Sequence, residues 1–406
     1  MSTVNWFTAF RCQLSIVNCQ LVYGVSVVKI IEKHVQLDFP LGHHLHCLIA
    51  QIPNRLRRRD HLFTLEKPEE QWRMVQSVLD LVAAGDGNLK RLHFLMFPET
   101  SVPLSHFDEM LSTIEHKFRP NTVTMFGLEQ ITLEQYRSLL IRFHADNADA
   151  LECVEHDVDS GDILGMPVNW CCVAIKESTG RVRVFLEAKT HPFRGEEFLD
   201  KDHDLYRGRH FYLFRGEPAC FNFMTIICLD YLYRDLYSSN IKQIIDHSNR
   251  LFFTMRQSLD ALFVIQCNPK PEHRSYREVL SGFYGEYLED TPGVRETVTL
   301  FGNCSDESEI QGVRCAPCYG ISFVAISAKH KMPPYQEREF SSDDFDGAPV
   351  CRLRFSSGTR LFYFNLPLNH ELDPRTSRVP LKVHAVMRWA GEEWVKVGDG
   401  EGQSSR

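Results

Sequence analysis

Short apolar runs alternate with segments of helical periodicity along most of this chain, which is the pattern of a layered α/β domain. The clearest helix is predicted over 68–84, where a proline and two glutamates begin the segment and Trp72, Val75 and Leu79 recur on one face. Further helices are predicted over 107–118 and 275–288. Strands are predicted over 46–51, 92–99, 123–128, 169–175, 181–187, 210–214, 219–228, 261–266 and 297–303, with two more within 349–365.

These elements predict one large domain spanning 45–390, because no domain-scale linker interrupts it. Residues 1–40 are expected to form an N-terminal appendage outside the ordered fold. The Gly- and Ser-rich segment 391–406 is expected to be a flexible tail. The periodicity weakens over 129–166, which we interpret as an insertion of helix and loop at the rim and a candidate lid.

Composition and charge exclude several classes of protein. Hydrophobic residues make up 43% and charged residues 24% of the 406 residues, as in ordinary globular proteins. The net charge of −8 provides no basic footprint for nucleic acid, and the arginine-rich run at 55–59 is interpreted as a solvated loop. No signal peptide or membrane span is recognisable, so a cytoplasmic location is expected.

The 13 cysteines are an odd number scattered along the chain, which indicates a reducing compartment rather than a disulfide framework. The CxxC pair of Cys315 and Cys318 has no second pair or HxxxH partner, so no metal site is predicted. Cys228 stands where an apolar strand gives way to polar residues. A thiol there is held rigidly, and a helix N-terminus lowers its pKa, so Cys228 is the candidate nucleophile; the alternative is a buried, inert thiol.

Two charged residues end other apolar strands. Glu99 follows LHFLMFP, and a partly buried carboxylate with a raised pKa is where a general base would be built. Lys189 follows RVRVFLEA, and its ammonium can stabilise developing negative charge. The alternatives are an ordinary loop glutamate and a surface lysine.

Glu99, Lys189 and Cys228 occur in that order within the motifs LMFPE, EAKTHP and IICLD. This set resembles the carbon–nitrogen hydrolase (nitrilase) superfamily, and so do HCLIAQIPN and FVIQCNPKP. The resemblance covers about residues 47–303. The interval between Glu99 and Lys189 is longer than the family's, which fits the insertion at 129–166. Leu229 and Asp230 also replace the aromatic residue plus Glu or Trp that more commonly follow the family's cysteine, so the identity of the substrate is left open.

The resemblance implies a four-layer-forming αββα sandwich and a thiol-dependent hydrolase of a non-peptide C–N bond in a small amide or nitrile. In that role Glu99 takes the thiol proton and Cys228 forms a thioester. Lys189 and the backbone N–H of Leu229 stabilise the oxyanion. Glu99 then activates the water that releases the acid.

The family also implies further features of the site and of the assembly. A second glutamate follows the lysine loop, and either Glu196 or Glu197 is the candidate. His191 is interpreted as a loop residue that shapes the pocket. No metal or organic cofactor is required, and a homodimer or higher oligomer is expected through the helix that follows the nucleophile.

Segments YRDL, NPKP and LFYFNLPLNHELDPRTSRVP are similar to nitrilase-like domains that accompany bacterial antiviral reverse transcriptases, although the chain has no YxDD polymerase motif. Two alternatives to hydrolysis stay open. One is a nitrilase-fold interaction or regulatory module, in antiviral defence, with little or no hydrolase activity. The other is acyl transfer from the same thioester. The intact Glu–Lys–Cys set favours an enzyme, whereas the insertion and the unusual CLD motif favour the module.

Overall fold

The computed structural model describes residues 28–39, 45–85, 87–193, 196, 204–233, 239–253, 255, 257–271, 273–287, 291, 294, 297–314, 320–327, 332–344, 350–366 and 381–397. The CxxC pair of Cys315 and Cys318 lies outside the described residues, and so does Glu197. Within these ranges no helix is long and apolar enough to cross a membrane.

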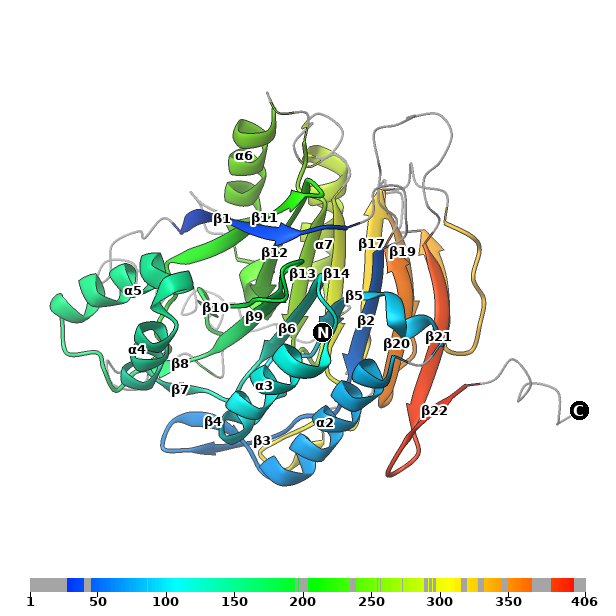
Figure 1. Ribbon diagram of the computed structural model, residues 1–406, viewed down its shortest axis with the longest axis horizontal. Helices are drawn as coiled ribbons and strands as arrows, with labels where there is room; N and C mark the ends of the chain where they lie inside the picture. Colours follow the sequence, from blue (N-terminus) through cyan, green and yellow to red (C-terminus); the bar gives the residue numbers. More distant parts are fainter. Residues whose placement is uncertain are drawn as a thin grey trace, which may run out of the picture.

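Two eight-stranded sheets form the centre of the molecule (Figure 1). In spatial order, sheet I consists of β1 (Lys29–Leu37), β11 (His210–Pro218), β12 (Phe221–Ile227), β13 (Ala261–Gln266), β14 (Val298–Asn303), β17 (Phe323–Ser327), β19 (Val350–Phe355) and β18 (Phe340–Asp344). Sheet II consists of β10 (Val182–Ala188), β9 (Trp170–Lys176), β6 (Thr122–Gly127), β5 (Leu92–Met96), β2 (Leu45–Gln51), β20 (Arg360–Leu366), β21 (Lys382–Trp389) and β22 (Trp394–Lys396).

The two sheets pack face to face through aromatic side chains. Phe94 of β5 lies between Phe223 of β12 and Phe263 of β13, with ring centroids 5.8 and 5.0 Å apart. Residues that alternate with these along sheet I, such as Met224 and Ile226, belong to a second apolar cluster on the sheet's other face. Both faces of the centre of sheet I are therefore buried, which explains why apolar residues predominate in its central strands.

Helices cover the outer faces of both sheets. On sheet I, Ile241 and Ile244 of α6 (Asn240–Phe252) and Tyr276 of α7 (Arg274–Gly282) join the second apolar cluster. On sheet II, α2 (Pro68–Ala84) buries its predicted face through Trp72 and Val75, and α3 (Phe107–Lys117) buries Phe107 and Met110. The predicted αββα order of layers is confirmed.

The segment 129–166, interpreted as an insertion and candidate lid, consists mainly of two helices that pack against β10. It contains β7 (Ile131–Thr132), α4 (Leu133–Arg142) and α5 (His144–Asp159), and β7 pairs with β8 (Pro167–Val168). Tyr136 donates a hydrogen bond to the backbone oxygen of Leu186 at 3.1 Å, and the side chain of Asn147 bonds the backbone of Val184 and Leu186 at 2.8 Å each. These bonds fix both helices to β10 (Figure 1).

Three sequence interpretations need correction. Of the expected appendage, the described part contains β1, which pairs in parallel with β11 at the edge of sheet I, and residues 1–27 lie outside the described residues. Of the expected tail, the described part contains β22, which pairs with β21, and residues 398–406 lie outside the described residues. The arginine-rich run is the strand β3 (Arg55–Arg59) and not a loop, and it pairs with β4 (Leu62–Leu65).

The remaining short elements are the strands β15 (Glu309–Ile310) and β16 (Val313–Arg314), the 3₁₀ turns η1 (Gly87–Arg91), η2 (Leu104–His106) and η3 (Cys228–Tyr231), and the π-turn η4 (Phe283–Tyr287).

Candidate active site

The three candidate residues lie where strands of the two sheets end. Lys189 directly follows β10, and Glu99 stands shortly after β5, both in sheet II. Cys228 directly follows β12 in sheet I. Because sheets I and II pack face to face, these strand ends bring all three side chains into one buried region between the layers.

A buried ion cluster surrounds the Lys189 ammonium. Its Nζ lies 2.8 Å from Oε1 of Glu99 and 2.9 Å from Oε2 of Glu196, and all three side chains are almost completely excluded from solvent. Burial acts to lower the pKa of Lys189, but the adjacent Glu196 and Glu99 carboxylates outweigh it and hold that pKa well above its ordinary value. Lys189 is therefore a fixed positive charge.

Two amides that sequence reasoning missed hold the carboxylates in place. Asn169 Nδ2 donates to Oε1 of Glu99 at 2.8 Å and to Oε1 of Glu196 at 2.6 Å. Gln130 Nε2 donates to the same Glu196 oxygen at 2.8 Å. The backbone N–H of Phe193 donates to the other Glu196 oxygen at 3.0 Å. Of the two candidate second glutamates, Glu196 thus lies in the cluster.

The second carboxylate oxygen of Glu99 accepts a hydrogen bond from the backbone N–H of Cys267, at the end of β13, at 2.9 Å. Burial acts to raise the pKa of Glu99, but the charge and hydrogen bond of Lys189, with the bonds from Cys267 and Asn169, hold it below its ordinary value. The raised pKa expected from burial alone is therefore not found, and Glu99 is ionised. The Cys267 sulfur lies 3.3 Å from that of Cys304.

A close backbone approach positions Glu99. A Cβ atom at Gly127 would lie 2.5 Å from the Cα atom of Glu99 and 2.6 Å from the backbone nitrogen of Thr100. Thr100 itself has a φ of 54°, in the left-handed region that non-glycine residues rarely adopt. The turn that carries Glu99 is therefore pressed against the end of β6, and only glycine fits there.

Cys228 sits on a sharp turn between β12 and η3. Its φ of 47° places a non-glycine residue in the left-handed region, a strain that recurs at functional sites. Burial, followed by the Glu99 charge, raises the pKa of the thiol well above its ordinary value, while Lys189 and Tyr276 oppose that change. The lowered pKa expected at a helix start is not found, because burial dominates.

Asp230 ties the lysine loop to the turn that carries Cys228. Its Oδ1 accepts hydrogen bonds from the backbone N–H and the hydroxyl of Thr190 at 3.0 and 2.8 Å, and from the backbone N–H of His191 at 2.8 Å. Burial raises the pKa of Asp230 to about 7, against these bonds and the charge of Lys189. His191 thus lies in a loop whose backbone is anchored by its hydrogen bonds to Asp230. Leu229, the candidate oxyanion donor, is the second residue of η3.

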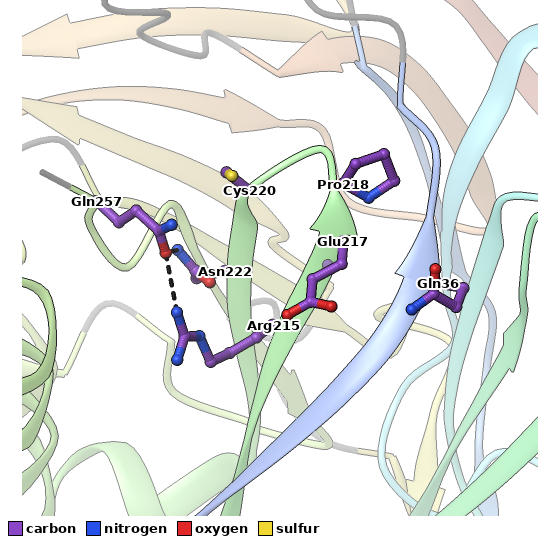
Figure 2. Close-up of a pocket in the computed structure, with 8 residues that line it drawn as sticks. Gln36, Arg215, Glu217, Pro218, Cys220, Asn222 and Gln257 are labelled. Carbon is purple, nitrogen blue, oxygen red and sulfur yellow. Dashed lines mark hydrogen bonds between the residues drawn. The ribbon is translucent and has the colours of Figure 1, made fainter. Parts of the chain in front are cut away.

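A cavity of about 490 Å³ lies at the opposite end of β12 from Cys228. Figure 2 shows Arg215 in this cavity, hydrogen-bonded to Gln257 at 3.2 Å, with Cys220 nearby. Arg215 also pairs with Glu32 at 3.1 Å. None of the candidate residues lines this cavity, so it is separate from the cluster around Lys189.

Among the described residues, no group of three or more His, Cys, Asp or Glu side chains is placed to hold a metal ion. The site instead combines a carboxylate that can accept a proton, a thiol that can attack, and a fixed ammonium. An arrangement of this kind is suited to acyl transfer through a covalent thioester.

No model of a known protein family matches the sequence, and no curated protein is significantly similar to it. Among solved structures, an amidase from Nesterenkonia sp. is similar at 11% identity with a TM-score of 0.41, over 78% of this chain and 92% of that chain. XC1258 from Xanthomonas campestris, a CN-hydrolase superfamily protein, is similar at 12% identity with a TM-score of 0.40, over 77% of this chain and 91% of that chain. Nit3 from Saccharomyces cerevisiae, in branch 10 of the nitrilase superfamily, is similar at 9% identity with a TM-score of 0.40, over 79% of this chain and 93% of that chain. Likeness at this level establishes neither a family nor an activity for this chain.

Proposed function

We propose that this chain is a thiol-dependent hydrolase of a non-peptide C–N bond in a small amide or nitrile. The observation that carries the proposal is the buried Glu99–Lys189–Glu196 cluster beside Cys228, whose backbone is held in the left-handed region. Keeping two carboxylates and an ammonium away from water costs several kcal/mol of desolvation per ion in folded proteins. A module that served only for assembly would gain nothing from that cost.

The proposed reaction begins when Glu99 accepts the thiol proton as the Cys228 sulfur forms a bond to the substrate carbon. Lys189 already donates to Glu99 and Glu196, which leaves one of its three N–H groups for the oxyanion. The backbone N–H of Leu229 is the second donor. With an amide, the oxyanion returns to a carbonyl, the C–N bond breaks, and the proton held by Glu99 passes to the departing amine or ammonia. With a nitrile, attack gives a thioimidate whose nitrogen takes that proton, and a water molecule activated by Glu99 adds before ammonia leaves and the thioester remains.

The thioester is hydrolysed in the second half of the reaction. Glu99 takes a proton from a water molecule, whose oxygen attacks the thioester carbon. The C–S bond breaks, its electron pair returns to the Cys228 sulfur, and Glu99 returns the proton to that sulfur. Glu196 keeps its hydrogen bonds to Lys189 and Asn169 throughout and so acts as a positioning residue.

A panel of small amides and nitriles tests this proposal. We expect at least one compound to release ammonia and to leave an acyl adduct on Cys228, detected by intact-protein mass spectrometry after an acid quench. Cys228→Ala should abolish both signals, whereas Cys220→Ala, at an exposed cysteine that precedes β12 at its opposite end, should retain both. If the wild-type protein shows neither signal with any compound, the hydrolase is refuted and the interaction module takes its place.

We also propose that the chain forms a homodimer through α6. Two large apolar side chains at the end of this helix, Phe253 and Met255, are 67% and 46% exposed. Burying them in a symmetric contact would remove apolar surface from water. Analytical ultracentrifugation of the wild type and of Phe253→Glu tests this, since the substitution should shift a dimer to monomer; a wild-type monomer would refute it.

A further inference from the structure

The Cys228 sulfur has a close neighbour that the proposed mechanism does not use. The hydroxyl oxygen of Tyr276, in the first turns of α7, lies 3.7 Å from the sulfur, a hydrogen-bonding separation for this large atom. Tyr276 is 5% exposed and belongs to the apolar cluster between α7 and sheet I. Its hydroxyl is therefore held against the thiol in a place where little water can compete.

The direction of this hydrogen bond depends on the charge of the sulfur. A neutral thiol and a phenol can each donate, but a thiolate can only accept. Once the sulfur becomes negative, Tyr276 must be the donor. Hydrogen bonds to charged atoms are about twice as strong as those between neutral groups, so the contact strengthens when charge develops.

The ammonium of Lys189 and the amide of Asn169 already donate hydrogen bonds to other partners. Two N–H groups of Lys189 point to Glu99 and Glu196, and its third serves the oxyanion in the proposed reaction. The amide of Asn169 donates to the same two carboxylates. The hydroxyl of Tyr276, by contrast, is directed at the Cys228 sulfur itself.

We propose that Tyr276 is a further catalytic residue, whose hydroxyl donates a hydrogen bond to the Cys228 sulfur whenever that sulfur carries negative charge. This inference rests on the proposed function. During attack the thiol proton passes to Glu99, the sulfur electron pair forms the C–S bond, and Tyr276 keeps its own proton. During deacylation the C–S bond breaks, and Tyr276 stabilises the departing thiolate until Glu99 returns the proton.

A matched pair of tyrosines makes the inference testable. Tyr231 stacks on Tyr276 with ring centroids 6.3 Å apart and is also buried, and its hydroxyl has no hydrogen-bond partner among the described residues. Tyr276→Phe and Tyr231→Phe therefore remove the same atom from the same cluster. They differ in whether that atom faces the sulfur.

The measurement is the rate of Cys228 alkylation by iodoacetamide from neutral to alkaline pH, followed by peptide mass spectrometry. We expect Tyr276→Phe to move the profile to higher pH and to slow alkylation at neutral pH about ten- to a hundredfold, as for the loss of one hydrogen bond to a charged group. Tyr231→Phe should leave the profile unchanged. A purely structural role for Tyr276 would not produce this difference between the two variants.

The possible outcomes distinguish a failure of the Tyr276 proposal from a failure of the proposed hydrolase function. If the Tyr276→Phe and wild-type profiles coincide while Glu99→Gln changes the profile, the tyrosine inference is overturned and the hydrolase stands. If Cys228 in the wild type is not alkylated at any pH, both fail. If Tyr276→Phe does not fold, biosynthetic replacement of tyrosine by the more acidic 3-fluorotyrosine provides the second measurement: faster alkylation supports the inference, and an unchanged rate overturns it.

Discussion

Lys189→Met removes the charge at the centre of the buried cluster and retains a side chain of similar length. Glu99 and Glu196 would then lie together in the interior with Asn169 as their shared hydrogen-bond donor. Leaving a buried charge without its partner costs about 3–5 kcal/mol. We therefore expect the free energy of unfolding at neutral pH to fall by roughly that amount, a large part of the 5–15 kcal/mol typical of a folded domain.

The pH dependence of stability should also change sign. In the wild type the pKa of Glu99 is below its ordinary value, so its contribution is fully present above the unfolded-state pKa and is lost as pH falls through the folded-state pKa. Without Lys189, burial is the largest remaining influence and raises the pKa of Glu99. Its contribution is then fully present below the unfolded-state pKa and is lost as pH rises through the folded-state pKa.

Urea unfolding followed by tryptophan fluorescence at about pH 7 and about pH 5 measures both effects. We expect Lys189→Met to gain stability on acidification, by about 1.4 kcal/mol for each unit by which the pKa of Glu99 is raised within that interval. Lys67→Met is the matched control, because Lys67 bonds Glu70 at 2.9 Å on the exposed surface, and its unfolding should follow the wild type at both pH values. A Lys189→Met protein as stable as the wild type at neutral pH, or one that loses stability on acidification, would refute the reasoning.

Three further substitutions probe what positions the site. Gly127→Ala should reduce turnover at least tenfold, because the added Cβ would overlap the turn that carries Glu99 and displace that residue. Gly282→Ala should keep wild-type turnover, because a Cβ at position 282 meets open space. Asn169→Asp places a third carboxylate in the cluster and should lower the free energy of urea unfolding by about 2 kcal/mol or more at neutral pH. The pKa of Asp230, raised by burial to about 7 from 3.8, implies stability that is lost as pH rises through this interval, and Asp230→Asn should flatten that part of the unfolding profile.

The fold was predictable where burial is complete on both faces of a strand. The strands β2, β5, β12 and β13 are buried at every position, so they appear in the sequence as runs in which apolar residues predominate. β1 escaped prediction because it lies at a sheet edge, where buried and exposed positions are mixed. β3 escaped because its arginines flank a single buried leucine, Leu56.

The site was predictable at its strand ends, which carry Glu99, Lys189 and Cys228. A carboxylate or ammonium that closes an apolar run is conspicuous, since burying it is costly unless it is paired. Asn169 and Gln130 carry no such signal, because an amide at the start of a strand or helix is ordinary in sequence. Their partner Glu196 is distant in the chain. The donor from Cys267 is a backbone N–H, which no residue type reveals.

The pKa values of Glu99 and Cys228 both depart from their sequence-based expectation, each for its own reason. Lys189 bonds the carboxylate directly and so lowers the pKa of Glu99, while burial and the negative charge of Glu99 raise the pKa of the thiol. The thiol of Cys228 therefore keeps its proton at rest, while the Glu99 carboxylate is unprotonated. In the proposed reaction the proton leaves the sulfur only as the C–S bond forms and the negative charge moves to the carbonyl oxygen of an amide, or to the nitrogen of a nitrile, next to Lys189. The substrate carbonyl or nitrile thus accepts the negative charge that the sulfur does not carry at rest. The nucleophile is therefore activated by the substrate and is not held as a thiolate beforehand.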